Sequence, residues 1–239
     1  MRVLAIVPAF NEEESLPALL AELRCVAVDG VVVDAVVVND ASSDSTDQVA
    51  RKCGATVLTL PANLGIGGAV QTGFLYAVRK DYDAVLQIDG DGQHDPGQIR
   101  HILAPILAGE ADCVIGSRYH ASQPDVAYRT PLARRIGMKF STGILKMATG
   151  LHVSDTTSGF RALNRSAFSF FATRYPVDHP EAEALLMLYQ AGFRIVEVPV
   201  TMRLRTTGQS LFSLFRAAAY PLRVSIGFLG IVFKGAQTR

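Results

Sequence analysis

Short, unbroken apolar runs alternate with segments in which apolar residues recur every three or four positions. The unbroken runs are rich in valine, which is typical of strands buried on both faces of a parallel sheet, and the other segments have helical spacing. The predicted strands are Val3–Val7, Val31–Val38, Ala55–Leu60, Ala84–Ile88 and Cys113–Ile115. The predicted helices are Glu13–Val26, Ser45–Cys53, Gly67–Arg79 and Pro96–Leu107.

This alternation predicts an α/β fold with a mostly parallel sheet flanked by helices on both faces. The pattern is less regular beyond about residue 118, where further elements are expected near Leu132–Met147, Phe160–Leu163, Pro180–Ala191 and Ile195–Met202. Residues 210–233 mix apolar side chains with arginines and are interrupted near Pro221, which suits an amphipathic helix lying in a membrane interface. A helix packed on the core or in a dimer is the alternative. We therefore divide the chain into a domain of residues 1–209 and an amphipathic helical extension of residues 210–239.

Composition and charge narrow the class of protein. Hydrophobic residues make up 49% of the chain and charged residues 19%, which supports a large core and argues against disorder. The net charge of +1 gives no reason to expect a nucleic-acid partner. Acids outnumber bases fourteen to seven in residues 1–100, whereas residues 194–239 contain seven bases and one acid. The acidic part suits a metal site, and the basic end suits phosphate or anionic lipid.

Cysteine usage and hydropathy predict a cytoplasmic protein. Cys25, Cys53 and Cys113 lack CxxC spacing and are expected to be buried free thiols in a reducing compartment. The N-terminus does not resemble a signal peptide, and no segment has the ~20 apolar residues that a membrane span needs.

Polar loops follow three of the predicted strands, at residues 8–12, 39–44 and 89–94. Parallel strands with right-handed crossovers end at one edge of the sheet, where α/β proteins bind ligands. Asp89 and Asp91 are the sharpest feature of these loops. Two carboxylates this close need a compensating cation, and Mg²⁺ or Mn²⁺ prefers oxygen ligands completed by phosphates. Gln93 offers a further oxygen, and an Asp- and Gly-rich turn is the alternative explanation.

Other residues allow a functional and a structural interpretation. Asp40 ends a strand and is expected to bind a base or a ribose, whereas Asp44 or Ser45 is expected to cap the next helix. The glycines near Gly67 lack both the GxGxxG and the P-loop spacing, which disfavours a dehydrogenase. Asp155 either orients sugar hydroxyls or forms a turn. Arg203 and Arg205 lie on one side of a strand and either grip phosphate or are solvated. His94 and His179 lack metal-ligand spacing, and Glu181 and Glu183 suit the start of a helix.

Taken together, these motifs resemble family 2 glycosyltransferases of the GT-A fold. The chain is most similar to the branch that contains dolichyl-phosphate mannosyltransferase and bacterial polyprenyl-phosphate glycosyltransferases. The matching motifs run in the family's order over residues 3–210. They are PAFNE (8–12), NDASSDST (39–46), NLGIGGA (63–69), DGDGQH (89–94), GSR (116–118), DTTSGFR (155–161) and RTTGQS (205–210).

The resemblance implies a role for each matching residue. The nucleotide and donor would be bound by Pro8, Phe10, Glu12, Asp40, Asn63, Gly67, Asp89 and Gly90. Asp89, Asp91 and Gln93 would hold the metal, and Arg118 would lie near the phosphates or the donor sugar. Asp155 would face the sugar or the acceptor, and Arg205, with Arg203 as a helper, would receive the acceptor phosphate. Arg118, Asp155 and Arg205 are therefore the expected catalytic residues.

Three departures from the family pattern matter. The second motif often reads Asp-Asp-Gly but is Asn39-Asp40-Ala41 here, so one usual carboxylate is absent. A QxxRW motif is missing, which disfavours processive synthases. Many relatives carry transmembrane helices after the catalytic domain, and similar short relatives are accompanied by a small membrane protein, which we expect as a partner.

The expected reaction is inverting transfer from a UDP- or GDP-sugar to a polyprenyl phosphate at the inner face of the membrane. The cofactor would be Mg²⁺ or Mn²⁺, and a homodimer is one expected assembly. Two alternatives stay open: transfer to a saccharide or protein hydroxyl, with Asp155 as the base, and an inactive nucleotide-sugar-binding subunit.

Overall fold

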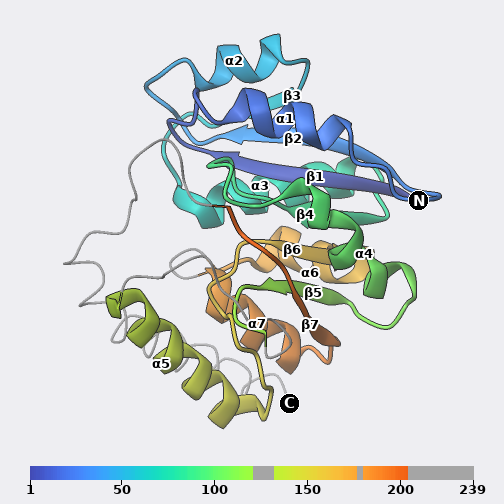
Figure 1. Cartoon of the computed structure of the whole chain (residues 1–239), viewed down its shortest axis with the longest axis vertical. Coiled ribbons are helices and arrows are strands. Elements are labelled where there is room, and N and C mark those ends of the chain that lie inside the picture. Colours follow the sequence, from blue (N-terminus) through green and yellow to red (C-terminus); the bar gives the residue numbers. More distant parts are fainter. Residues whose placement is uncertain (121–131, 177–179, 204–239) are drawn as a thin grey trace.

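The structure is a computed structural model that describes residues 1–120, 132–176 and 180–203 (Figure 1). Within these residues the sheet has seven strands in the order β3-β2-β1-β4-β6-β5-β7. The strands are β1 (Arg2–Ala9), β2 (Val32–Asn39), β3 (Thr56–Thr59), β4 (Ala84–Gln87), β5 (Cys113–Ser117), β6 (Arg161–Asn164) and β7 (Ile195–Pro199). The helices are α1 (Leu16–Arg24), α2 (Thr46–Lys52), α3 (Gly65–Arg79), the 3-10 helix η1 (Pro96–Gln98), α4 (Ile99–Leu107), α5 (Leu132–Thr149), α6 (Arg165–Arg174) and α7 (Pro180–Gln190).

The sheet is mostly parallel, which confirms the predicted fold class. Strands β1 to β4 are parallel where they pair, as are β5 and β7. Only β6 runs antiparallel to its neighbours β4 and β5. Its first residue, Arg161, pairs with Gln87 at the end of β4, so residues 154–160 arrive at the edge where the parallel strands finish. We call the edge at which the parallel strands end the carboxyl edge of the sheet, and the edge at which they begin the amino edge.

Alternation along the central strand β1 divides the core between the two faces of the sheet. Val3, Ala5 and Val7 belong to one core cluster together with buried residues of α1, α2 and α4. Leu4 and Ile6 belong to a second cluster together with α3, α6 and α7. The helices therefore cover both faces of the sheet (Figure 1).

Helix α3 approaches β1 closely because it carries glycine at position 73. A Cβ atom there would lie 2.3 Å from Cγ2 of Ile6. The close packing of α3 on β1 thus depends on Gly73, while Gly67 is buried near the start of α3.

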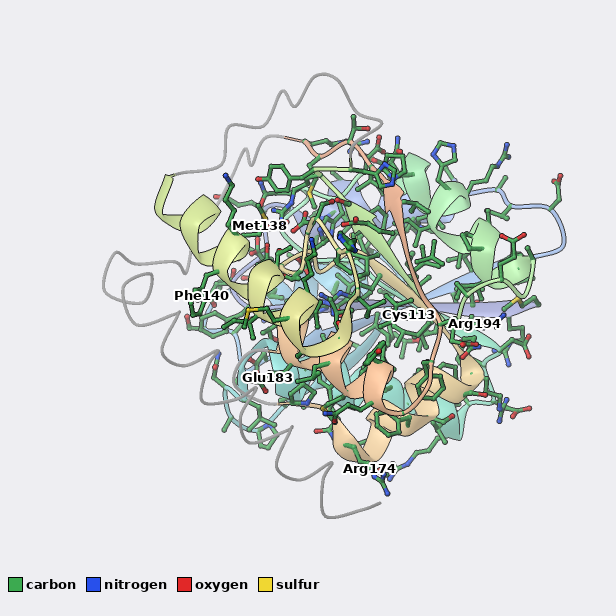
Figure 2. The ribbon with its side chains drawn as sticks, turned by 90° about the horizontal axis from the view of Figure 1, so that it is seen from below. Cys113, Met138, Phe140, Arg174, Glu183 and Arg194 are labelled. Carbon is green, nitrogen blue, oxygen red and sulfur yellow. The ribbon has the colours of Figure 1, made fainter. Side chains whose placement is uncertain are left out.

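The second half of the chain departs most from the predicted elements. Helix α6 was not expected; it follows β6 directly, and Asn164 Oδ1 caps it by accepting the Ala167 N–H at 3.0 Å. Helix α5 packs against α7, with Met138 buried and Phe140 exposed on α5 (Figure 2). None of the helices in the described part of the chain combines the length and hydropathy needed to cross a bilayer. The predicted extension of residues 210–239 lies outside the described residues.

The cysteines are free, as expected, but they are not all buried. Cys113 is buried in β5, and desolvation raises the pKa of its thiol to about 11, which makes the reactive thiolate scarce at neutral pH. Cys25 is exposed and Cys53 half-buried, because they follow the ends of α1 and α2 rather than lying within a strand. The prediction of three buried thiols is therefore wrong for these two.

Candidate active site

The loops after β1 and β2 form one hydrogen-bonded unit at the carboxyl edge. Asn11 has a left-handed backbone (φ 56°), its N–H donates to Ser42 Oγ at 3.0 Å, and its side-chain oxygen accepts the Ser43 N–H at 2.8 Å. The Glu12 N–H donates to Thr46 Oγ1 at 2.9 Å. Residues 11–12 and 42–46 therefore hold each other in place, next to the buried Pro8 and half-buried Phe10.

Ser15 joins this unit to the loop after β4. Its hydroxyl lies 3.0 Å from Glu12 Oε2 and 2.6 Å from the Gly90 carbonyl oxygen. Gly90 also packs tightly, since a Cβ there would lie 3.1 Å from the Pro8 carbonyl oxygen. Three predicted donor-binding residues, Pro8, Glu12 and Gly90, are thus brought together.

Asp40 attaches the start of α3 to the end of β2. Its side chain is buried, and its two oxygens accept the N–H groups of Leu64 at 2.7 Å and Gly65 at 2.8 Å. The Asn63 amide also reaches the Asp40 carbonyl oxygen at 3.3 Å. A carboxylate that accepts the first N–H groups of a helix is a structural anchor. A contact between Asp40 and a nucleotide base stays a prediction.

Asp44 has the structural role that the sequence predicted. Its Oδ1 accepts the Thr46 N–H at 2.9 Å, at the start of α2, whereas Ser45 makes no side-chain cap. Nearby Ala41 has a left-handed backbone (φ 57°). Glycine is the residue that adopts this conformation without strain. The Gly at this position in the family pattern therefore has a conformational reason.

The candidate metal ligands lie on the loop after β4. Asp89 and Gln93 are half-buried, and Asp91 Oδ1 accepts the Gln93 N–H at 3.0 Å, which folds the loop into a turn. His94 is buried and stacks on Phe160, with ring centroids 4.9 Å apart. Its Nδ1 accepts the Asp89 N–H at 3.0 Å, and its Nε2 lies 3.8 Å from Asp89 Oδ2. His94 thus contacts both the main chain and the carboxylate of Asp89 and holds them in place.

Gly159 allows the loop before β6 to lie against the Asp89 carboxylate. A Cβ at position 159 would lie 2.7 Å from Oδ2 and 2.8 Å from Oδ1 of Asp89. Residues 1–120, 132–176 and 180–203 contain no group of three or more His, Cys, Asp or Glu side chains that could hold a metal. The oxygens of Asp89, Asp91 and Gln93 suit a hard divalent cation that takes its remaining ligands from phosphates and water.

Arg118 and Asp155 form a buried ion pair where the ends of β5 and the loop before β6 meet. Arg118 is 6% exposed and Asp155 0%; Arg118 Nε lies 2.6 Å from Oδ2, and Nη2 lies 2.8 Å from Oδ1. Thr157 Oγ1 accepts from the same Nη2 at 2.9 Å. Burial alone would raise the pKa of Asp155, but the hydrogen bonds and charge of Arg118 outweigh burial and lower that pKa. Asp155 is therefore an ionised partner that orients Arg118.

Glu197, on β7, is a residue of this region to which the sequence reasoning assigned no role. Its carboxylate accepts the N–H groups of Ser154 and Asp155, each at 2.9 Å, and the Ser154 hydroxyl at 2.9 Å. Ser154 Oγ also lies 2.9 Å from Ser117 Oγ at the end of β5. The sequence feature that could have indicated this role is a single acid in an otherwise apolar predicted strand.

Arg203 pairs with acids of α1 and of the start of η1. The Arg203 guanidinium pairs with Glu22 and Asp95, each at 2.8 Å. The backbone N–H of Arg203 donates to the Gln93 carbonyl oxygen at 2.8 Å. These contacts tie the chain after β7 to the loop that carries the candidate metal ligands. A role of Arg203 on the acceptor phosphate stays a prediction, and Arg205 lies outside the described residues.

The predicted helix-start acids and histidines have separate outcomes. Glu183 is buried in α7, whereas the side chain of Glu181 and all of His179 lie outside the described residues. His94 is buried, and its Nδ1 accepts the Asp89 N–H.

A mostly parallel sheet, paired carboxylates after β4 and a polar loop before an antiparallel strand agree with the expected GT-A glycosyltransferase fold. The family model described as glycosyl transferase family 2 matches residues 4–171. The chain belongs to this family.

Relatives with assigned activities match nearly the whole chain. Undecaprenyl-phosphate mannosyltransferase of Micrococcus luteus is 33% identical over 226 residues, which cover 89% of this chain and 88% of the relative. Polyprenol monophosphomannose synthase of Mycolicibacterium smegmatis is 29% identical over 241 residues, which cover 93% of this chain and 88% of the relative. The resemblance to this branch is thereby confirmed.

A solved structure supports the fold independently. The glucosyl-3-phosphoglycerate synthase of Mycobacterium tuberculosis, crystallised with Mn²⁺, UDP and glucosyl-3-phosphoglycerate, has a TM-score of 0.72 and 21% identity. The match covers 96% of this chain and 79% of the synthase. At this identity it establishes the GT-A-like fold alone.

Proposed function

We propose that this chain transfers a sugar, with inversion, from a UDP- or GDP-sugar to a polyprenyl phosphate in a reaction that needs Mg²⁺ or Mn²⁺. The observation that carries the proposal is the meeting of two loops at the carboxyl edge: the Asp89 carboxylate lies against Gly159, in the loop that also supplies the Asp155 partner of Arg118. A diphosphate-binding carboxylate and an oriented arginine belong to the same small region.

The donor end of the reaction falls to the loops after β1, β2 and β4. Asp89, Asp91 and Gln93 would hold the divalent cation, which would supply positive charge for the departing nucleoside diphosphate. Ser15 and Glu12 fix the Gly90 loop from the other side, so the ligands are held before the donor arrives. A preorganised site of this kind stabilises the charge that grows on the leaving group.

The acceptor end is better suited to a phosphate than to a hydroxyl. A hydroxyl acceptor requires a general base, and Asp155 was the candidate. Both Asp155 oxygens are buried against Arg118, which also lowers the pKa of Asp155, so the carboxylate is a poor proton acceptor. A phosphate monoester is already anionic near neutral pH and needs orientation more than deprotonation. Arg118, which Asp155 holds in place, is one candidate to orient the acceptor phosphate, and Arg205 is the other.

The lipid acceptor implies a place at the membrane. The proposed location is the cytoplasmic side, peripheral on the inner face, through the amphipathic residues 210–239. The M. luteus and M. smegmatis relatives, whose names specify undecaprenyl phosphate and a polyprenol, support a lipid of this class. A small membrane protein and a second copy of the chain are the proposed partners.

A screen of nucleotide sugars tests the proposal. Purified protein is incubated with each UDP- or GDP-sugar, a polyprenyl phosphate and Mg²⁺ or Mn²⁺, and products are identified by mass. The expected result is a glycosyl-phospholipid that forms only with metal. Transfer to a saccharide or peptide but never to lipid would overturn the lipid acceptor. Metal-dependent hydrolysis of the donor without any transfer would exclude the inactive nucleotide-sugar binder. It would also contradict polyprenyl phosphate as the acceptor.

Flotation with liposomes tests the membrane location. Vesicles that contain anionic phospholipid are expected to carry the full chain upward in a density gradient, more strongly at low salt than at high salt. A truncated chain that lacks residues 210–239 is the matched sample. Full-length protein that stays entirely in the soluble fraction would contradict the membrane location.

A further inference from the structure

We propose that Glu197 is a positioning residue for the transfer reaction: it holds the Ser154–Asp155 backbone so that Asp155 meets and orients Arg118. The inference rests on the proposed function for its kinetic consequence. Its structural part is that Glu197 of β7 fixes the position of Arg118 through Asp155, and this part rests on the contacts alone.

The first step is the set of hydrogen bonds that converge on one carboxylate. Glu197 Oε1 accepts the Ser154 N–H, the Ser154 hydroxyl and the Asp155 N–H, each at 2.9 Å. Oε2 accepts the Ser154 N–H at 3.0 Å. Two consecutive backbone N–H groups and a hydroxyl are therefore fixed by one side chain of another strand. Charge-assisted bonds of this kind are stronger than neutral ones.

The second step is the register of the sheet. Glu197 pairs with Ile115 of β5, three residues before Arg118. Ser117 touches Ser154 through their hydroxyls, at 2.9 Å. The strand that leads to Arg118, the turn that carries Asp155 and the strand that carries Glu197 thus meet at one point. Residues 154 and 155 cannot shift together without disturbing the contacts to Ser117 and Glu197.

The third step is the transfer of this order to Arg118. Asp155 binds the guanidinium through two oxygens, and its Oδ2 also accepts the Arg118 N–H at 3.3 Å. A guanidinium held in this fork keeps one plane and one direction. A displacement of about 1 Å at a reacting centre costs roughly 100-fold in rate. Anchoring of Asp155 by Glu197 therefore affects turnover through Asp155, the residue that binds the Arg118 guanidinium.

The cost of placing an acid at this position supports a specific role. Val196 and Val198, on either side of Glu197, pack against the hydrophobic core. Glutamate is disfavoured in strands, and a half-buried charge there needs partners. Sequences depart from such local preferences mainly at functional or strained sites.

Kinetics of two Glu197 variants test the proposal. Glu197→Leu removes every acceptor, and we expect kcat to fall about 100-fold while the KM for the nucleotide sugar changes less than about threefold. Glu197→Gln keeps one acceptor oxygen, and we expect it to restore activity to within about tenfold of the unmodified chain. Equal kcat in Glu197→Leu and the unmodified chain would overturn the proposal, as would a loss confined to KM.

Asp112→Asn is the matched control, because Asp112 ties the same strands together at the amino edge. It accepts the Arg194 N–H at 2.8 Å and pairs with the Arg194 guanidinium at 3.0 Å. This variant is expected to lower the melting temperature without changing kcat. If Asp112→Asn lowered kcat as much as Glu197→Leu, general loosening of β5 and β7 would explain both, and the positioning role would fail.

Hydrogen exchange of the full chain separates this inference from the proposed function. In Glu197→Leu, the amides of Ser154 and Asp155 are expected to exchange faster, and so is the Arg118 amide, which donates to Asp155. Unchanged exchange at Arg118 would overturn the fixing of Arg118 through Asp155. If the unmodified chain transferred no sugar to polyprenyl phosphate, the proposed function would fail, and the Arg118 amide would still decide this inference.

Discussion

The two edges of the sheet carry the same kinds of charged residue and use them differently. At the amino edge, arginines pair with acids of neighbouring segments: Arg2 with Asp34 at 3.3 Å, Arg165 with Asp81 at 2.6 Å and Arg194 with Asp112 at 3.0 Å. These arginines are about half exposed. Figure 2 labels Arg194 and Cys113, whose main chains are joined there by a hydrogen bond of 3.1 Å. The charge attraction in pairs with an exposed arginine contributes little to stability, so the stability contribution of Asp112 comes mainly from its hydrogen bonds to the Arg194 N–H and to Asn164.

At the carboxyl edge, most acids fix loops by accepting backbone N–H groups, whereas at the amino edge an arginine side chain comes in addition to such a bond, as at Asp112. Asp40, Asp44, Asp91 and Glu197 each fix a loop in this way, and the Arg118–Asp155 pair is almost fully buried. Loops held by their own backbone donors can present groups to a ligand without collapsing onto one another. The comparison teaches that acids at strand ends indicate a site by what they bind, and not by their number.

The largest expected difference between the edges concerns the metal ligands. Asp91→Asn removes a carboxylate that we assign to the cation, yet an amide oxygen can still accept the Gln93 N–H that shapes the turn. We expect transfer to fall roughly 1,000-fold, in the range seen when one group that stabilises transition-state charge is removed. Initial rates at saturating donor and increasing Mn²⁺ measure this. Asp34→Asn at the amino edge is the control, and equal losses in both variants would contradict the assignment.

A smaller loss, of metal affinity, is expected when the loop before β6 is displaced from the loop that carries Asp89 and Asp91. In Gly159→Ala, the new Cβ would overlap the Asp89 carboxylate, so one of the two must move. We expect metal affinity to fall about 10- to 100-fold, as for other changes just behind metal ligands. Mn²⁺ titration followed by calorimetry in the presence of UDP measures it.

Gly143→Ala supplies the matched substitution for this test. Gly143 lies in α5, and a Cβ there meets nothing within 4 Å. This variant should keep full metal affinity and gain up to about 1 kcal/mol of stability from the better helix propensity of alanine. A Gly159→Ala protein with unchanged metal affinity would show that the close contact with Asp89 has no consequence.

Acid should destabilise both edges, but salt should distinguish them. Hydrogen bonds from Arg194 lower the pKa of Asp112, despite some desolvation. For Asp155, burial opposes the larger combined effect of Arg118, and its pKa is also lowered. A folded-state pKa below the unfolded value means that each group contributes stability above the unfolded pKa of about 3.9, and this stability is lost as pH falls through the folded pKa.

Melting temperatures between pH 7 and pH 3, at low and at 1 M salt, measure this difference. Salt should weaken the contribution of the exposed Asp112 pair, since its charges are screened, and leave that of the buried Asp155 pair nearly intact. Asp112→Asn and Asp155→Asn each remove one contribution. If salt abolished the acid dependence that is lost in Asp155→Asn, the pair would behave as exposed.

The sequence predicts those features of the fold and site that depend on residues close together in the chain. The strands and the first four helices follow from periodicity over ten to twenty residues, and the loop positions follow from the parallel order of the strands. The Arg118–Asp155 pair joins residues 37 apart, and the role of Glu197 requires the β5–β7 register. No local pattern contains that register. Arg203 was matched to a phosphate by its spacing, but its direction depends on Glu22 and Asp95, which lie far away in the chain.

The smallest expected effect concerns backbone strain at the two edges. Among the described residues, Asn11, Ala41 and Asp81 are the non-glycine positions with positive φ. Asparagine and aspartate tolerate this conformation, whereas alanine does not, at a cost of about 1–2 kcal/mol. Ala41→Gly at the carboxyl edge should therefore stabilise the protein by about 0.5–1 kcal/mol, after the flexibility of glycine in the unfolded chain is counted.

Urea unfolding with an unchanged m-value measures the gain. Asp81→Gly at the amino edge should give less or even a loss, since aspartate is already tolerated there and the Arg165 pair disappears. Ala35→Gly, inside β2 and without positive φ, should destabilise by about 0.5–1 kcal/mol and shows what glycine costs without strain to relieve. If Ala41→Gly destabilised as much as Ala35→Gly, the left-handed conformation at residue 41 would carry no strain, and the glycine of the family pattern would need another reason.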